Sequence, residues 1–191
     1  MKNKLDLYNI NSIRPFVRNI LKYKKSGSVL DLGSAAGRHS LFLAKKGFTV
    51  TAVEISSEFT AALKEIVRLQ KLKVKVVIGD VTKFTPKKKY DVIISTMVLH
   101  FLPYQIQSKQ IELMQSNTKR NGLNVISSYS DKNKDGIRPY PLMKDKIKDA
   151  YEGAGWKILH HHVGRGTHVI DPRTGKKGSG FWKEELIAQK V

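Results

Sequence analysis

The sequence contains no cysteine, and this absence removes several kinds of chemistry at once. Without thiols there can be no disulfide, no thiolate metal ligand and no cysteine nucleophile. Small proteins of oxidising compartments commonly depend on disulfides, so the composition gives no sign of such a compartment. We therefore expect the chain to work in the cytoplasm.

Long apolar runs are also absent. No stretch approaches the roughly 18–20 apolar residues that cross a bilayer, and Met1–Asp6 lacks the apolar run of a signal peptide. There is no internal repeat and no low-complexity linker. We expect no membrane segment, and a chain of 191 residues is long enough to bury a core as one domain.

Acidic residues are scarce relative to basic ones. The chain has 16 Asp and Glu against 35 Lys and Arg, which gives a formal net charge of +19. Such an excess suits a nucleic-acid or other anionic partner, but runs of charge are also typical of a solvated surface. The lysines are spread along the chain with few aromatic residues among them, so we expect a mainly solvated surface and keep a nucleic-acid partner as the alternative.

Strand-like and helix-like segments alternate along the chain, which predicts a parallel sheet. The expected strands are Ser28–Leu32, Thr49–Val53, Lys73–Ile78, Tyr90–Ser95 and Leu123–Tyr129, with an antiparallel pair formed by Trp156–Val163 and Phe181–Val191. The expected helices cover residues 11–24, 37–46, 56–70, 103–117 and about 142–153. The fold class is therefore α/β, a doubly wound, mostly parallel seven-stranded Rossmann-like sheet with helices on both faces and an antiparallel last strand.

The densest functional signal is Val29–Arg38, in which an apolar strand enters a turn of small residues and then a helix. Small residues let the backbone approach a ligand closely, and the start of the helix offers free N–H groups. Its glycines, Gly33 and Gly37, do not follow the G-x-G-x-x-G spacing of dinucleotide enzymes. The basic side chain that ends the segment can pair with a carboxylate. We expect cofactor contacts from Asp31, Gly33, Ser34, Gly37 and Arg38.

Acidic side chains follow the next two strands. Glu54 ends the second strand about twenty residues beyond the turn, where a carboxylate can accept hydrogen bonds from both hydroxyls of a ribose. Asp80 follows the third strand, where an acid can accept from an adenine amine while Val81 packs on the ring. Ile55 and Ser95 complete the expected cofactor contacts. Open α/β sheets bind ligands at the carboxyl ends of their strands, so these signals form one constellation.

These residues resemble a known family. Val29–Arg38 resembles the cofactor loop of class I S-adenosylmethionine-dependent methyltransferases, and other stretches are similar to the TehB tellurite-resistance branch of that class. Those stretches are Tyr90–Leu99 with Phe101–Leu102, Met114–Gln115 with Gly122–Ile126, Tyr151–Gly153 and Gly166–His168. The resemblance covers roughly residues 26–191. It implies S-adenosyl-L-methionine as cofactor and methyl transfer as activity.

The resemblance suggests how one methyltransferase domain over residues 1–191 would be organised. We expect an N-terminal helical segment (1–25), a cofactor-binding half (26–130) and a substrate-side half (131–191). Several positions depart from the family: Ser34 stands where a cysteine is common, Ala35 for a glycine, His100 for a methionine, Val169 for an arginine and Lys176–Lys177 for a second arginine. These departures leave the cofactor expectation in place and weaken the expectation for the substrate.

Methyl transfer from a sulfonium is an in-line displacement, in which the protein mainly aligns the acceptor and excludes water. Candidate catalytic residues are Thr96 and His100 after the fourth strand and His168 in the last loop. His100 has a side chain that titrates near neutral pH and can act as a base or donor, or it can simply pack. His168 with Arg165 can clamp an anion or close as a lid, or face solvent. Tyr140 is a further candidate near the methyl group.

Three histidines in a row, His160–His162, suggest a metal site at first sight. Alternate residues of a strand face opposite sides, so at most two of them share a face, and no further ligand lies nearby in the sequence. We expect no bound metal.

The preferred acceptor is a small molecule or a metalloid oxyanion such as tellurite or selenite, or a thiol. A nucleic-acid methyltransferase is the first alternative. Ser95–Val98 lacks the Asn/Asp-Pro-Pro-aromatic turn of enzymes that methylate base amines, and cytosine-C5 chemistry needs a cysteine. A non-catalytic S-adenosylmethionine-binding module is the second alternative. The sequence does not specify the oligomeric state.

Overall fold

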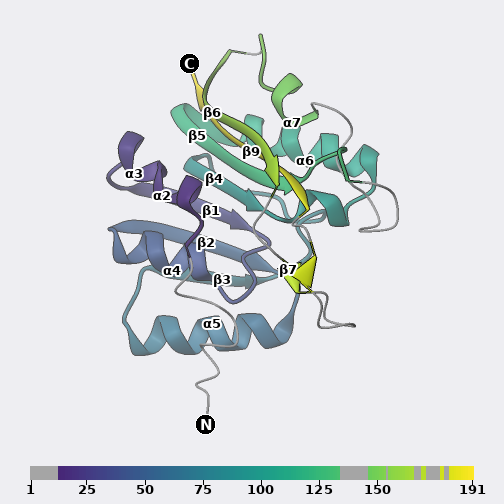
Figure 1. Cartoon of the computed structure of the whole chain (residues 1–191). Helices are drawn as coiled ribbons and strands as arrows, with labels where there is room; N and C mark the ends of the chain where they lie inside the picture. The colour runs from purple at the N-terminus through teal and green to yellow at the C-terminus, as the bar shows by residue number, and fades with distance from the viewer. Residues whose placement is uncertain (1–12, 134–145, 154, 166–168, 171–176, 179–180) are drawn as a thin grey trace.

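The computed structural model describes residues 13–133, 146–153, 155–165, 169–170, 177–178 and 181–191. Seven strands form one sheet in the order β3-β2-β1-β4-β5-β9-β6 (Figure 1). They are β1 (Gly27–Leu32), β2 (Phe48–Glu54), β3 (Val74–Ile78), β4 (Tyr90–Thr96), β5 (Thr118–Tyr129), β6 (Trp156–Arg165) and β9 (Trp182–Lys190). β9 is antiparallel to both of its neighbours, whereas the other pairings are parallel. This arrangement confirms the expected mostly parallel, Rossmann-like α/β sheet.

Two short helices precede β1, and most of the others connect successive strands as the alternation predicted. They are α2 (Pro15–Arg18), α3 (Ile20–Tyr23), α4 (Arg38–Lys45), α5 (Ser57–Leu69), the 3₁₀ helix η1 (Leu99–Phe101), α6 (Tyr104–Ser116) and α7 (Lys146–Asp149). Figure 1 shows α2 lying across the sheet and α5 along its β3 side. Among the helices of the described residues, none is long and apolar enough to cross a membrane.

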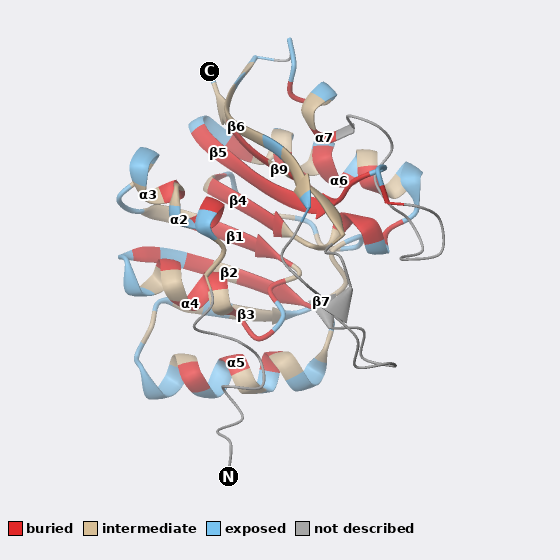
Figure 2. Cartoon of the chain, viewed as in Figure 1, coloured by how far each residue is buried: buried red, intermediate tan, exposed pale blue. Residues whose placement is uncertain are grey.

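Side chains of the central strands alternate between two apolar clusters. Leu30 and Leu32 of β1 belong to a cluster that α6 and α7 complete, whereas Val29 belongs to one that α2, α3 and α4 complete. Figure 2 shows the buried residues concentrated on the central strands. Burial of apolar surface stabilises such layers by roughly 25 cal/mol per Å². The packed sheet therefore fixes the positions of the residues at the strand ends.

Several elements differ from the sequence prediction. The helix expected over residues 11–24 is divided into α2 and α3 at Asn19, a residue of low helix propensity whose N–H bonds to Phe16; residues 11–12 lie outside the described part. The helix expected over about 142–153 is described only as α7, and residues 142–145 also lie outside. β5 begins at Thr118, five residues before the predicted start, because Thr118 already pairs with Tyr90 of β4. A short pair, β7 (Val169–Ile170) with β8 (Lys177–Gly178), was not predicted.

Candidate functional site

Strand register brings the predicted cofactor residues to one edge of the sheet. Leu32, the last residue of β1, pairs with Val53 of β2 and with Ser95 of β4. Glu54 in turn pairs with Ile78 at the end of β3. The carboxyl ends of these parallel strands therefore meet, and the turn after β1 lies between the ends of β2 and β4. We call this side of the sheet the carboxyl edge.

The turn after β1 needs glycine at two positions. Gly33 and Gly37 have φ values of 71° and 82°, in the left-handed region that side chains other than glycine rarely adopt. A Cβ on Gly33 would lie 2.4 Å from Val98 Cγ2, and one on Gly37 would lie 2.3 Å from Leu63 Cδ1. Both glycines are thus required by backbone conformation and by space.

Ala35 lies between these glycines with a φ of 48°. A left-handed conformation costs a residue with a side chain roughly 1–2 kcal/mol. The methyltransferases that this chain resembles usually have glycine here, because glycine adopts a left-handed conformation without this cost. The N–H of Ala35 donates to Glu54 Oε2 at 2.9 Å, so the strained residue is tied to the end of β2.

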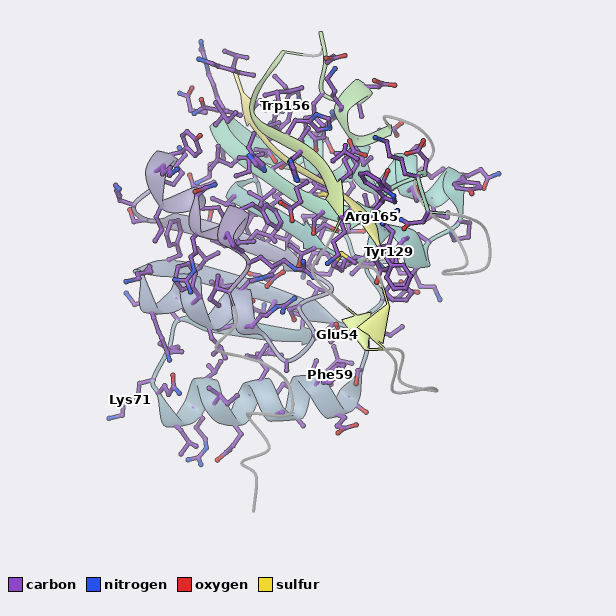
Figure 3. The ribbon with its side chains drawn as sticks, viewed as in Figure 1. Glu54, Phe59, Lys71, Tyr129, Trp156 and Arg165 are labelled. Atoms are coloured by element: carbon purple, nitrogen blue, oxygen red, sulfur yellow. The ribbon has the colours of Figure 1, made fainter. Side chains whose placement is uncertain are left out.

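Glu54 is buried, with 8% of its surface exposed, and both of its carboxylate oxygens accept backbone hydrogen bonds. Oε2 accepts from Ala35, and Oε1 accepts from the N–H of Ser56 at 2.9 Å. The Ser56 hydroxyl caps α5 by accepting from the N–H of Phe59. Figure 3 shows Glu54 toward the same end of the sheet as Tyr129 and Arg165. The carboxylate therefore joins three segments: the turn after β1, the end of β2 and the start of α5.

Asp31 is a second buried acid close to the turn. Its Oδ2 accepts from the Ser40 hydroxyl at 2.7 Å. Burial raises the pKa of Asp31 to about 6, and the negative charge of Glu54 adds to the rise, whereas the Ser40 hydrogen bond and the positive charge of Arg38 oppose it. The ionised form of Asp31 is thus destabilised in the folded protein, as is common for carboxylates at functional sites.

The third strand brings Asp80 and Val81 to the same edge as Ile55, which follows the second strand. Asp80 Oδ1 accepts from the N–H and from the hydroxyl of Thr82, both at 2.8 Å, and these bonds lower the pKa of Asp80. Val81 packs at the margin of an apolar cluster. Ile55, directly after Glu54, is 67% exposed. An exposed apolar residue beside a buried acid offers one surface for a flat ring and one acceptor for its sugar.

Several buried polar atoms at this edge have no hydrogen-bond partner among the described residues. They include Ser34 Oγ in the turn and Ser95 Oγ near the end of β4. Buried polar groups are almost always bonded, so these hydroxyls are suited to a polar ligand. The glycine turn, the two acids and these hydroxyls fit an adenosyl cofactor.

His39 lies next to the predicted residue Thr96, and the sequence analysis did not single it out. It lies in the first turn of α4, is buried, and places its Nδ1 3.2 Å from the Thr96 hydroxyl. Burial lowers the pKa of His39 to about 3, with further lowering by the charges of Arg38 and Arg14. The imidazole is therefore neutral at physiological pH. The one available signal was its place directly after Arg38.

Arg14, Arg38 and Lys183 form a cluster of partly buried cations, of which Arg14 and Arg38 act on His39 through their charges. Burial lowers the pKa of all three, and the two arginines lower the pKa of Lys183 further. Glu185 and Asp31 oppose this effect. Arg14 Nε is buried and has no hydrogen-bond partner among the described residues. The cluster therefore has the charge and the free donor to receive an anion. Sequence reasoning missed Arg14 and Lys183 because they come from opposite ends of the chain.

The three predicted catalytic residues differ in what the structure says of them. Thr96 contacts His39, as described above. His100 is buried, with its Nδ1 3.1 Å from the Ser128 hydroxyl, and its ring lies 4.3 Å from the ring of Tyr129. His168 lies outside the described residues, as does Tyr140. The catalytic roles of all three stay predictions.

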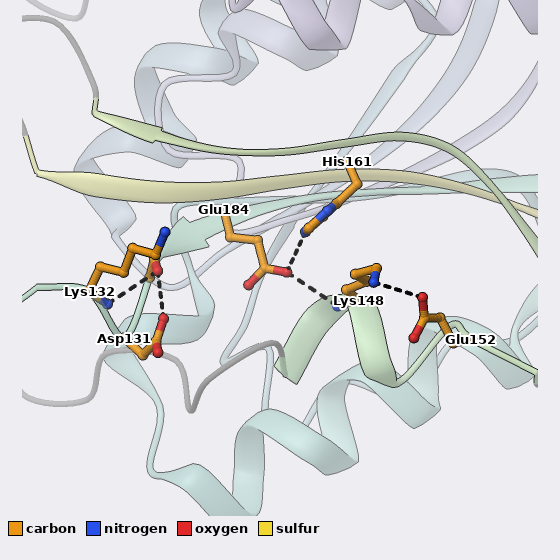
Figure 4. A network of polar contacts seen from close by, with 7 residues as sticks. Asp131, Lys132, Lys148, Glu152, His161 and Glu184 are labelled. Carbon is orange, nitrogen blue, oxygen red and sulfur yellow. Dashed lines mark hydrogen bonds and ion pairs between the residues drawn. The ribbon is translucent and has the colours of Figure 1, made fainter.

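The row of histidines in β6 makes polar contacts with acids of β9. His161 Nε2 lies 3.1 Å from Glu184 Oε1, which also accepts from the N–H of Lys148 (Figure 4). His160 Nε2 lies 3.9 Å from Glu185 Oε2. Within the described ranges, no group of three acids and histidines is arranged to hold a metal ion.

The sheet is parallel except for β9, which is antiparallel and second-last in the strand order. Together with a small-residue turn after β1 and an acid at the end of β2, this arrangement defines the Rossmann-like methyltransferase fold. The family model of the tellurite resistance protein TehB matches residues 3–175. The chain belongs to this family, which confirms the resemblance found in the sequence.

Individual relatives agree with this assignment. Haemophilus influenzae TehB, a probable S-adenosyl-L-methionine-dependent methyltransferase, is 28% identical over 163 residues, which are 83% of this chain and 56% of the relative. The crystal structure of TehB from Haemophilus influenzae superposes with a TM-score of 0.86 and 25% identity, covering 98% of this chain and 65% of that one. This chain thus spans a little more than half the length of its curated relative.

A more distant structure shares the fold alone. The 1,6-didemethyltoxoflavin-N1-methyltransferase of Burkholderia thailandensis, solved with bound S-adenosylhomocysteine, has a TM-score of 0.70 and 17% identity, covering 93% of this chain and 77% of that one.

Proposed function

We propose that the chain transfers a methyl group from S-adenosyl-L-methionine to a small anionic or soft acceptor. The observation that carries the proposal is the contact between the glycine turn and Glu54 at the carboxyl edge. Membership of the TehB family and the cofactor product bound in a structural neighbour support the choice of cofactor.

Each part of the cofactor has a candidate partner at this edge. Glu54 would accept from the ribose hydroxyls, and Asp80 would accept from the adenine amine with Ile55 and Val81 packing on the ring. Arg38 would pair with the methionine carboxylate. The turn amides with Ser34, Gly33 and Gly37, together with Asp31 and Ser95, would surround the remainder. When bound, the cofactor supplies a methyl group on a sulfonium, and a soft or anionic acceptor needs no strong base.

The acceptor side is proposed to lie at the cluster of Arg14 and Lys183. An anion placed there would reduce the repulsion among the buried cations and bond to Arg14 Nε. His39 and Thr96 border the same region, and His168 and His100 stay candidates for orienting the acceptor. The family name favours a metalloid oxyanion such as tellurite. Selenite, small thiols and carboxylates share the required charge.

An acceptor screen with methyl-labelled S-adenosyl-L-methionine tests this function. The screen contains tellurite, selenite, small thiols, carboxylates and total RNA. Arg14→Gln and Lys183→Gln should each raise KM for the anionic acceptor by about tenfold, since a hydrogen bond to a charged group contributes roughly 1.5–3 kcal/mol. Cofactor affinity should change by less than about threefold, as for the exposed control Lys109→Gln. An unchanged KM in both variants would remove the cation cluster from the acceptor site.

A further inference from the structure

The edge opposite the cofactor site is strongly basic. In a parallel sheet the beginnings of all strands share one edge, which we call the amino edge. The five parallel strands β3, β2, β1, β4 and β5 bring to it, in spatial order, Lys73, Lys46, Lys25, Lys89 and Arg120. The antiparallel β9 ends there with Lys190, beside Lys157 at the start of β6. Every strand of the sheet therefore contributes a cation, and we call these seven residues the basic edge.

Neighbouring cations strengthen the basic edge: Lys24, Lys45, Lys71, Lys87, Lys88 and Lys119. Lys119 is paired with Asp91 at 2.9 Å. By contrast, Lys46, Lys73, Lys89, Arg120 and Lys157 are exposed, and no ion pair involves them within the described part of the chain. Their charges are therefore available to an external partner.

The charge distribution differs at the two edges of the sheet. At the carboxyl edge, acids from several segments lie near the cations. They are Glu54, Glu58, Asp80, Asp131, Glu184 and Glu185. Figure 3 shows Lys71 and Glu54 toward opposite ends of the sheet. The large positive charge of the sequence is thus concentrated away from the place proposed for methyl transfer.

The geometry of the basic edge suits a line of phosphates. Neighbouring strands lie about 4.8 Å apart, so seven strands give an edge of roughly 29 Å. A nucleic-acid strand in a duplex carries a phosphate about every 3.4 Å along the axis, so on the order of eight phosphates could face this length. A hollow of about 620 Å³ opens between the starts of β1, β2, β4 and β5, lined in part by Lys88, Lys89 and Lys119.

We propose that the basic edge binds the sugar-phosphate backbone of a nucleic-acid duplex, as an anchor and not as the methyl acceptor. Exposed aromatic side chains on which unpaired bases would stack are few at this edge, Tyr23 being one, which favours contact with the backbone over the bases. The exposed apolar residues near it, Leu69 and Val191 with Tyr23, come from three separate parts of the chain. A membrane surface would instead be met by an apolar face flanked by cations.

Fluorescence anisotropy with labelled duplexes of about 20 base pairs, one of DNA and one of RNA, tests the anchor. Between about 50 and 200 mM salt, the logarithm of the association constant should fall with a slope of about 0.9 for each phosphate contacted. Lys87→Gln/Lys89→Gln/Arg120→Gln should weaken binding at low salt at least tenfold and reduce the slope by about two to three. A matched variant with the same net charge, Lys64→Gln/Lys83→Gln/Lys109→Gln, should bind within about twofold of the wild type.

Four outcomes would overturn the proposal. The first is an equal loss of affinity in both triple variants, which would make net charge alone responsible. The second is an unchanged affinity in the basic-edge variant. The third is tighter binding to vesicles of phosphatidylcholine with phosphatidylserine than to either duplex, which would assign the surface to a membrane. The fourth is methyl transfer to the duplex itself, which would make it the acceptor. Cofactor affinity of the basic-edge variant, measured in parallel, keeps this test separate from that of the proposed function.

Discussion

The two edges of the sheet are built from the same strands, yet their charged side chains differ in burial and in bonding. At the carboxyl edge two acids beside the turn are buried and bonded within the protein: Glu54 accepts from two backbone N–H groups, and Asp31 accepts from the Ser40 hydroxyl. At the amino edge Lys46, Lys73 and Lys89 are exposed. The net charge of +19 therefore describes neither edge by itself, because the excess of positive charge lies mainly at the amino edge.

Helix dipoles account for part of this asymmetry. Cations are stabilised near helix C-termini and anions near N-termini by roughly 0.3–1 kcal/mol each, which suits Lys45 in the last turn of α4 and Glu58 in the first turn of α5. The run Lys87–Lys89 follows a loop and no described helix ends there. Helix dipoles therefore account for the position of some of the lysines, but they do not account for Lys87–Lys89 in the central part of the basic edge.

The largest expected change in stability comes from Asp31 at the carboxyl edge. Its pKa is raised from 3.8 to about 6, so the folded state favours the protonated form. The stability that this proton provides is complete below about pH 4 and is lost as the pH rises through about 6, which amounts to about 3 kcal/mol. Asp31→Asn should thus be more stable than the wild type at pH 7.5 and equal to it near pH 4 in urea unfolding. An advantage that does not vary with pH would contradict the buried ionised state.

Glu54→Gln tests whether the other buried acid beside the glycine turn serves the cofactor. The amide keeps the size of the side chain, but its NH₂ group would face a backbone donor and could not accept from both ribose hydroxyls. We expect affinity for S-adenosyl-L-methionine to fall by about 1.5–3 kcal/mol, the usual scale for buried groups left unbonded. Calorimetric titration measures this loss, and an affinity equal to the wild type would separate Glu54 from the cofactor.

A smaller gain is expected from Ala35→Gly. Glycine adopts the φ of 48° without a steric penalty but makes the unfolded chain more flexible, so the net gain should be about 0.5–1 kcal/mol. Thermal unfolding should then shift upward by roughly 1–4 °C. A lower unfolding temperature would mean that the Ala35 methyl group contributes packing that outweighs the strain.

The smallest effect belongs to the amino edge. Lys87→Gln/Lys89→Gln/Arg120→Gln should change the free energy of unfolding by less than about 0.5 kcal/mol, since exposed side chains without partners contribute little to folding. Urea unfolding checks this value. A loss above about 1 kcal/mol would show that these cations support the fold, and the contrast between the two edges would then disappear.

The sequence predicted the sheet well because alternation of apolar residues is a local property. β1, β2 and β4 each lie within one or two residues of their predicted bounds. The pair β7–β8 was missed because strands of two residues have no periodic pattern. The break at Asn19 was missed because spacing alone does not register where a helix interrupts its own hydrogen bonds.

The predicted cofactor residues rest on local signals, and the sheet register brings them to one edge. Gly33 directly follows β1, Gly37 directly precedes α4 and Glu54 ends β2, so their neighbourhood could be inferred from one segment at a time. Arg14 and Lys183 could not be singled out in this way, because their proposed role depends on their proximity in the folded chain, which neither segment shows by itself. The division of the chain into one domain with two halves stays a prediction.

The central claim is that a cofactor binds at the carboxyl edge and that the charges of the amino edge take no part in this binding. Calorimetric titration of S-adenosyl-L-methionine into the wild type, Glu54→Gln and Lys87→Gln/Lys89→Gln/Arg120→Gln tests it most directly. We predict micromolar affinity for the wild type, which corresponds to about 8 kcal/mol. The affinity should fall at least tenfold for Glu54→Gln and change by less than about twofold for the basic-edge variant. No binding by the folded wild type, or an equal loss in both variants, would contradict the claim.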